Sequence, residues 1–84
     1  MITVKTIENE ILKDENMEVE YSNIYENCLE VYHNSVYTDL ILTNAENLTD
    51  EIDTVIFNNG NHELQLLLPN MNEIISNLYQ RIDY

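Results

Sequence analysis

The feature that most restricts the fold is a short polar run between two apolar stretches. Residues 55–57 and 62–66 are rich in apolar side chains, and between them lies the run Asn58-Asn59-Gly60-Asn61. An Asn-Gly pair supplies the two positive φ values that a type I′ turn requires. The sequence therefore predicts a β-hairpin over 55–66 with a type I′ turn at its tip.

An amphipathic helix is predicted directly after this hairpin. Pro69 ends the second hairpin strand, and Asn70 with Glu73 three positions later matches the start of a helix with a capping box. Apolar residues then recur every three or four positions, at Met71, Ile74, Ile75, Leu78 and Ile82. The sequence predicts that this helix covers one face of a sheet.

Three earlier segments have the patterns of strands. Residues 17–21 alternate strictly between apolar and acidic side chains, so this strand has one buried face and one acidic face in water. Residues 25–33 alternate less regularly, and residues 36–42 are β-branched, aromatic and almost continuously apolar. A polar stretch follows over 44–53, which suits a loop or a single helical turn.

The amino-terminal segment has two interpretations. Val4, Ile7, Ile11 and Leu12 form an apolar stripe if residues 5–14 are helical, with Thr3 as the N-cap. The alternative is a short strand over residues 2–6. With the helix, the chain is predicted to be α+β, a single small domain over 1–84. Its antiparallel sheet has about four to five strands, with an N-terminal helix and a C-terminal amphipathic helix packed on one face.

The charge of the chain narrows the classes of partner. The chain has sixteen acidic and three basic side chains, which gives a formal net charge of −13. DNA, RNA and anionic membranes attract clusters of Lys and Arg, so direct binding to any of them is not expected. The apolar fraction of 44% argues against a disordered acidic tail. One cysteine and no apolar run of about 18 residues suit a cytoplasmic protein. The chain is expected to be a monomer or a weak homodimer.

The residues that could carry chemistry are few. Cys28 and His33 are five apart on a predicted strand, so they point to opposite faces, and Cys28 is expected to be a small buried apolar residue. The run 50–53 lacks the glycine and spacing of a calcium loop, and Gly60 alone cannot form a phosphate-binding loop. We therefore expect no enzyme activity, no cofactor and no metal site.

The acidic residues themselves are the candidate binding site. Magnitudes of about 2–8 are enough for solubility, and self-repulsion at −13 opposes folding of a small domain. Carboxylates along a strand face can occupy a basic groove built for phosphates, with tyrosines as anchors. The residues predicted to bind a partner are Glu18, Glu20, Tyr21, Tyr25, Glu26, Glu30, Asp39, Asp50, Glu51 and Asp53.

In size, charge and general design the chain resembles small acidic proteins that phages use to block host defences. These include anti-CRISPR proteins and uracil-DNA glycosylase inhibitors. The run 54–80, with a strand, an Asn-Asn-Gly-Asn turn, a strand and a helix, is similar to an arrangement in α+β anti-CRISPR proteins. The resemblance implies a stoichiometric inhibitor of a basic nucleic-acid-binding host protein or complex, acting in the host cytoplasm. Alternatives are an immunity or antitoxin-like protein that neutralises a basic toxin, and a structural or assembly protein.

Overall fold

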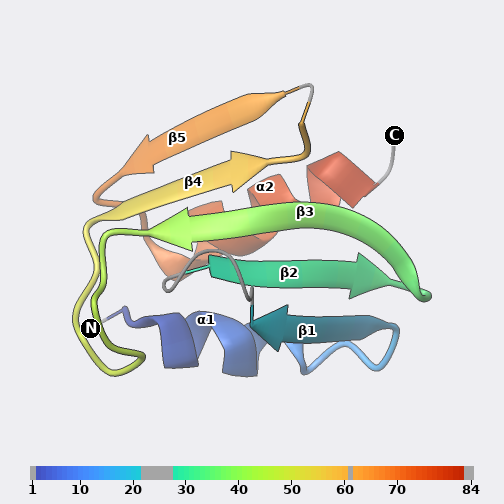
Figure 1. Cartoon of the computed structure of the whole chain (residues 1–84), viewed down its shortest axis with the longest axis horizontal. Coiled ribbons are helices and arrows are strands. Elements are labelled where there is room, and N and C mark those ends of the chain that lie inside the picture. The colour runs from blue at the N-terminus through green and yellow to red at the C-terminus, as the bar shows by residue number, and fades with distance from the viewer. Residues whose placement is uncertain (1, 22–27, 61, 83–84) are drawn as a thin grey trace.

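The described residues form five antiparallel strands and two helices, as the α+β prediction requires. The computed structural model describes residues 2–21, 28–60 and 62–82. Its elements are α1 (Val4–Ile11), β1 (Met17–Tyr21), β2 (Cys28–His33), β3 (Val36–Thr43), β4 (Thr54–Asn58), β5 (Glu63–Leu67) and α2 (Met71–Ile82). The strands follow the order β1-β2-β3-β4-β5 in one open sheet, so each strand pairs with its neighbour in the sequence (Figure 1).

The hydrophobic core lies between one face of this sheet and the two helices. Val31, Ile41 and Phe57 point to that face and are fully buried. They form one cluster with Ile7 of α1 and Ile74 of α2, and both helices lie behind the sheet in Figure 1. We call this the covered face. Among the described residues, no helix covers the opposite face, which we call the open face.

Each helix begins at a capping box. In α1 the backbone N–H of Thr6 donates to Thr3 Oγ1 at 3.1 Å, and the N–H of Thr3 donates to Thr6 Oγ1 at 2.8 Å. In α2 the N–H of Glu73 donates to Asn70 Oδ1 at 2.8 Å, and the N–H of Asn70 donates to Glu73 Oε1 at 3.3 Å. Both bonds of each box satisfy donors that the first helical turn leaves unpaired. The helical interpretation of the amino terminus and the predicted cap at Asn70 are confirmed.

The predicted hairpin between β4 and β5 is confirmed, but its turn type is wrong. Pairing ends at Asn58 opposite Glu63, so the loop spans four residues, and among its described residues only Gly60 has a positive φ, of 91°. Side chains at the start of the loop accept hydrogen bonds from its backbone N–H groups. Asn58 Oδ1 accepts from the N–H of Gly60 at 2.7 Å, and Asn59 Oδ1 accepts from the N–H of His62 at 2.8 Å.

The pattern of a type I′ turn occurs instead between β2 and β3. His33 pairs with Val36, which leaves Asn34 and Ser35 as a two-residue loop with φ values of 52° and 67°. Two positive φ values match the twist of the flanking strands. Asn tolerates this backbone region better than most residues, and Ser35 carries no β-branch. The sequence marks a break between the two strands at Ser35 but does not predict the type of turn.

Candidate partner-binding surface

Three carboxylates gather on the open face of β1 and β2. Strict alternation along β1 sends Met17 into the core and turns Glu18 and Glu20 to the open face, where both are exposed. Glu20 lies directly opposite Glu30 of β2 in the register of the two strands. Like charges in this position destabilise a sheet pair. The fold therefore holds two negative groups together at a cost to its own stability.

Two tyrosines lie beside these carboxylates. Tyr32 is the cross-strand partner of Glu18, and its hydroxyl donates to Glu30 Oε2 at 3.2 Å. Its ring meets that of Tyr37 edge to face, with 5.7 Å between the ring centroids. A register shift between Val31 and Tyr32 brings the two tyrosines opposite each other. We call Glu18, Glu20, Glu30, Tyr32 and Tyr37 the acidic sheet face.

The tyrosines of the acidic sheet face remain hydrogen-bond donors at neutral pH. Burial and then the bond to Glu30 raise the pKa of Tyr32. Burial and then the charge of Asp39 raise the pKa of Tyr37 to about 12. A phenol with a raised pKa keeps its proton, and both protons are used within the chain, since Tyr32 donates to Glu30 and Tyr37 to the carbonyl of Asn58 at 3.5 Å. Each hydroxyl oxygen can still accept a hydrogen bond from a partner. The sequence places both among the tyrosines beside the acidic segments that could act as anchors. Their position next to Glu18 and Glu30 depends on the strand register and its shift, which the sequence does not show.

All three basic side chains of the chain are paired with other acids. Lys5 lies 3.6 Å from Glu8 and Lys13 lies 2.9 Å from Glu10, both along α1, and Arg81 of α2 is paired with Asp39. None of these pairs includes a carboxylate of the acidic sheet face. The described part of this face therefore combines acids without a Lys or Arg partner.

Asp39 does not belong to a partner-binding surface, which corrects the sequence prediction. It has the same parity along β3 as the core residue Ile41 and is 0% exposed. Its carboxylate accepts from the Arg81 guanidinium and from the N–H of Leu40 at 3.1 Å. Burial raises the pKa of Asp39, and Arg81 opposes that rise. Asp39 is thus half of a buried ion pair.

Of the two tyrosines predicted to bind a partner, the structure describes only Tyr21, and it does not lie with Glu18 and Glu20. Tyr21 has the parity of Met17 and Val19, so it lies on the covered side of β1, where its hydroxyl donates to Glu8 of α1. Burial, followed by this bond to Glu8, raises the pKa of Tyr21 to about 12. It is therefore separated from Glu18 and Glu20 by the sheet. Tyr25 and Glu26 lie outside the described residues.

A second acidic group lies on the loop between β3 and β4. Asp50, Glu51 and Asp53 belong to this loop, and we call them the acidic loop. A bridge pairs Glu51 with Thr3, and the N–H of Lys5 donates to the carbonyl of Leu48 at 3.1 Å. The acidic loop thus lies beside the start of α1, as Figure 1 shows, and is not continuous with the acidic sheet face. The sequence prediction had grouped the two.

Cys28 is a small buried residue, as predicted, and its thiol should be inert. It is 1% exposed on β2, and burial, followed by the charge of Glu30, raises its pKa to about 11. Because the thiolate is the reactive form, we expect almost no alkylation by iodoacetamide at pH 8 in the native protein. Unfolding in urea should restore the reactivity of an ordinary cysteine. Rapid alkylation of the folded protein, followed by mass spectrometry, would contradict this expectation.

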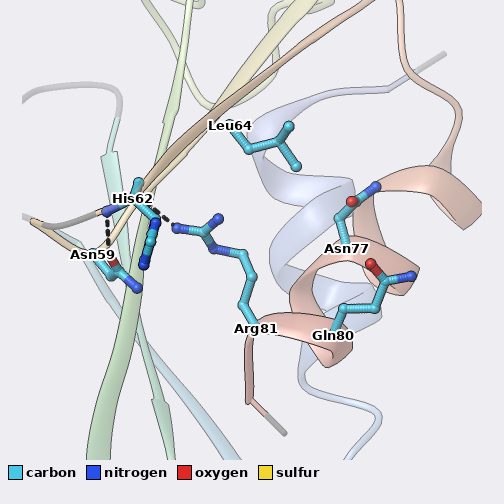
Figure 2. A pocket seen from close by; sticks show the side chains of 6 residues that line it. All are labelled: Asn59, His62, Leu64, Asn77, Gln80 and Arg81. Atoms are coloured by element: carbon cyan, nitrogen blue, oxygen red, sulfur yellow. Dashed lines mark hydrogen bonds between the residues drawn. The ribbon is translucent and has the colours of Figure 1, made fainter. Parts of the chain in front are cut away.

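A cavity of about 440 Å³ lies between β5 and α2 (Figure 2). It is lined by Asn59, His62, Leu64, Asn77, Gln80 and Arg81. Its cation is already engaged, because Arg81 pairs with Asp39 and also donates to the carbonyl of His62 at 2.9 Å. The remaining lining groups are mostly neutral hydrogen-bonding side chains. The one Arg side chain of this lining is therefore committed to contacts within the chain.

The described residues contain no group of three or more His, Cys, Asp or Glu side chains that could hold a metal ion. None of their helices is long and apolar enough to span a membrane. No protein-family model, curated protein or solved structure matches the chain.

Proposed function

We propose that the chain is a stoichiometric protein inhibitor that presents the acidic sheet face to a basic nucleic-acid-binding groove. The observation that carries this proposal is the pairing of Glu20 with Glu30, next to Glu18, with every Lys and Arg paired elsewhere. An opposed pair of like charges costs on the order of 0.2–1 kcal/mol of folding free energy. Lys and Arg side chains of a partner would remove that repulsion on binding.

The spacing of these carboxylates supports a phosphate-like role. Glu18 and Glu20 are two residues apart on one strand face, which places them roughly 6.6 Å apart along the strand. Glu30 lies on the adjacent strand, at a strand separation of about 4.8 Å. A groove that binds a row of phosphates offers cations at comparable intervals. Electrostatic steering then accelerates association, and salt weakens the complex.

The tyrosines supply the contacts that charge alone lacks. Tyr32 and Tyr37 present aromatic rings and hydroxyl oxygens beside the carboxylates. Tyrosine is enriched among the residues that contribute most to the affinity of interfaces. The partner we propose is a host defence protein or complex that binds nucleic acid, in keeping with the resemblance to phage-encoded inhibitors. No catalytic step is required of the inhibitor.

The test compares two triple variants that change the net charge equally. The variant E18Q/E20Q/E30Q neutralises the acidic sheet face, and the control D50N/E51Q/D53N neutralises the acidic loop. We expect the first to weaken binding to the target at least about tenfold, and the control to change it less than about threefold, because only close charge pairs contribute strongly at an interface. Calorimetry or surface plasmon resonance at several salt concentrations measures both, and wild-type affinity should fall as salt rises.

Equal losses from the two variants would show that bulk charge, and not the acidic sheet face, determines binding. Affinity that does not change with salt would also count against the proposal. The target itself is identified by affinity capture from a host lysate, with the E18Q/E20Q/E30Q variant as the control bait. Nucleic acid that competes with the inhibitor for the captured protein would place both ligands in the same groove.

A further inference from the structure

We infer that the chain forms a weak homodimer in which the β5 strands of two copies pair antiparallel, joining the two sheets edge to edge. β5 is the last strand in the order, and among the described residues no strand pairs with its outer edge. Its backbone donors and acceptors on that side are available for another strand, which is the usual hazard of an edge. This inference does not depend on the proposed inhibitory function.

The two edges of the sheet differ in how well they resist self-pairing. If the β1 strands of two copies paired antiparallel about Val19, Glu18 of each copy would lie opposite Glu20 of the other. These like charges oppose pairing at the β1 edge. β5 has one charged residue, Glu63, and no Lys, Arg or Pro within Glu63–Leu67. Its pairing with β4 runs without a register shift, so no bulge twists this edge away from a partner. Only the β5 edge lacks these protective devices.

The sequence of β5 is suited to pairing with itself about a two-fold axis at Gln65. That register pairs all five residues of both strands, and residues directly opposite each other share a face. Leu64 meets Leu66 of the second copy on the covered side, and Glu63 meets Leu67 on the open side. Gln65 meets its own copy, where the two amides can hydrogen-bond. No two carboxylates are opposed in this arrangement.

Exposed apolar groups concentrate at the same edge. Leu67 is 70% exposed and Leu68, directly after β5, is 80% exposed. Leu68 also has a φ of 48°, a backbone region that is uncommon for leucine, so a large apolar side chain is held outward there. Below the strand, Leu64 lines the cavity between β5 and α2, as Figure 2 shows. Leu66 of the second copy would lie beside that open space.

The area of one strand pair is small, and each chain carries a charge of −13, so the dimer is expected to be weak at low salt. Salt screens the repulsion between copies and should strengthen the dimer. This dependence is opposite in sign to that expected for the inhibitor with a basic groove. Sedimentation equilibrium of the wild-type chain, over a range of concentrations and from about 50 to 500 mM salt, measures it.

Two substitutions at one exposed position test the register. Leu67→Glu places a carboxylate opposite Glu63 of the second copy in two symmetric positions, and should weaken dimerisation about tenfold. Leu67→Lys places a cation there and should preserve or strengthen it. Val36→Glu, at an equally exposed apolar residue distant from β5, is the control and should weaken the dimer much less than Leu67→Glu does. Circular dichroism verifies that each variant is folded.

A wild-type chain that stays monomeric at millimolar concentration and high salt would overturn the inference. Equal weakening by Leu67→Glu and Leu67→Lys would also overturn it, since that result indicates nonspecific apolar contact. Loss of the dimer in E18Q/E20Q/E30Q, with no effect of Leu67→Glu, would place the contact on the acidic sheet face instead. These outcomes do not depend on whether the two triple variants confirm or contradict the proposed inhibition.

Discussion

The variant Arg81→Met should lose about 3–5 kcal/mol of the free energy of unfolding, since removal of one partner leaves a buried charge uncompensated. Asp39 is 0% exposed and the Arg81 side chain is 12% exposed, so in the folded protein the guanidinium, and not water, compensates the charge of this carboxylate. A small domain has a total stability near the lower end of roughly 5–15 kcal/mol. Urea denaturation followed by circular dichroism should show a large fraction of this variant unfolded at neutral pH.

A pH series gives the same prediction a second readout. Without Arg81 the pKa of Asp39 rises further, so the folded state binds a proton that the unfolded state does not bind. Stability falls with rising pH wherever the folded state holds more protons. The deficit of Arg81→Met relative to wild type should therefore shrink as pH falls from 7 towards the ordinary pKa of an aspartate.

The double variant Asp39→Asn/Arg81→Met tests the pair as a unit. The amide removes the buried charge and keeps an acceptor for the N–H of Leu40. We expect it to be more stable than Arg81→Met alone, with a coupling energy on the order of 1–3 kcal/mol. Lys13→Met is the control, because Lys13 is paired with Glu10 on the surface and 73% of its side chain is exposed. An equal loss in Lys13→Met and Arg81→Met would contradict the assignment of a buried pair.

The variant Phe57→Ala should destabilise the protein by about 3–5 kcal/mol. Phe57 is fully buried on β4, paired with Ile41 on one side and Leu64 on the other. Its removal leaves a cavity between the sheet and the helices that so small a core fills poorly by relaxation. The measurement is the midpoint of urea denaturation at constant slope.

Phe57→Leu is the graded control and should lose only about 1–2 kcal/mol, because it keeps most of the buried apolar volume. Phe57 also lies under the Arg81 guanidinium, whose central carbon is 5.7 Å from the ring centroid. The losses in Phe57→Ala and Arg81→Met should therefore not be additive. Additive losses would show that the cation and the ring do not interact.

Local patterns in the sequence predict most of the fold. The capping residues Thr3 and Asn70 fix where both helices begin, and alternation over 17–21 predicts both the bounds and the acidic face of β1. Those signals work because their physical causes lie within a few residues. The prediction of the turn type between β4 and β5 was wrong because it considered only the Asn-Gly pair and not the side chains around it. Asn59 does not adopt the positive φ that a type I′ turn at Asn59-Gly60 needs, and side-chain bonds from Asn58 and Asn59 hold the loop instead.

The candidate site was predicted in part. Glu18, Glu20 and Glu30 share one face, as alternation implies, and the same alternation already places Tyr21 on the opposite side. Asp39 could be identified as an inward residue only from its parity with Ile41. Its partner Arg81 is 42 positions later in the chain, and such a pairing leaves no local signal. The opposition of Glu20 and Glu30 depends on strand register, which tertiary packing determines.

The strand order described above also bears on how the protein folds. Every strand pairs with its sequence neighbour, so the sheet can grow one hairpin at a time through short-range contacts, which favours fast folding. Asp39 is the exception, because its carboxylate keeps its hydration until Arg81 arrives with α2. We therefore expect the docking of α2 and the exclusion of water around Asp39 to occur in the same folding step. On this expectation a chain that is still being synthesised forms its strands early, and its core closes only after α2 has been made.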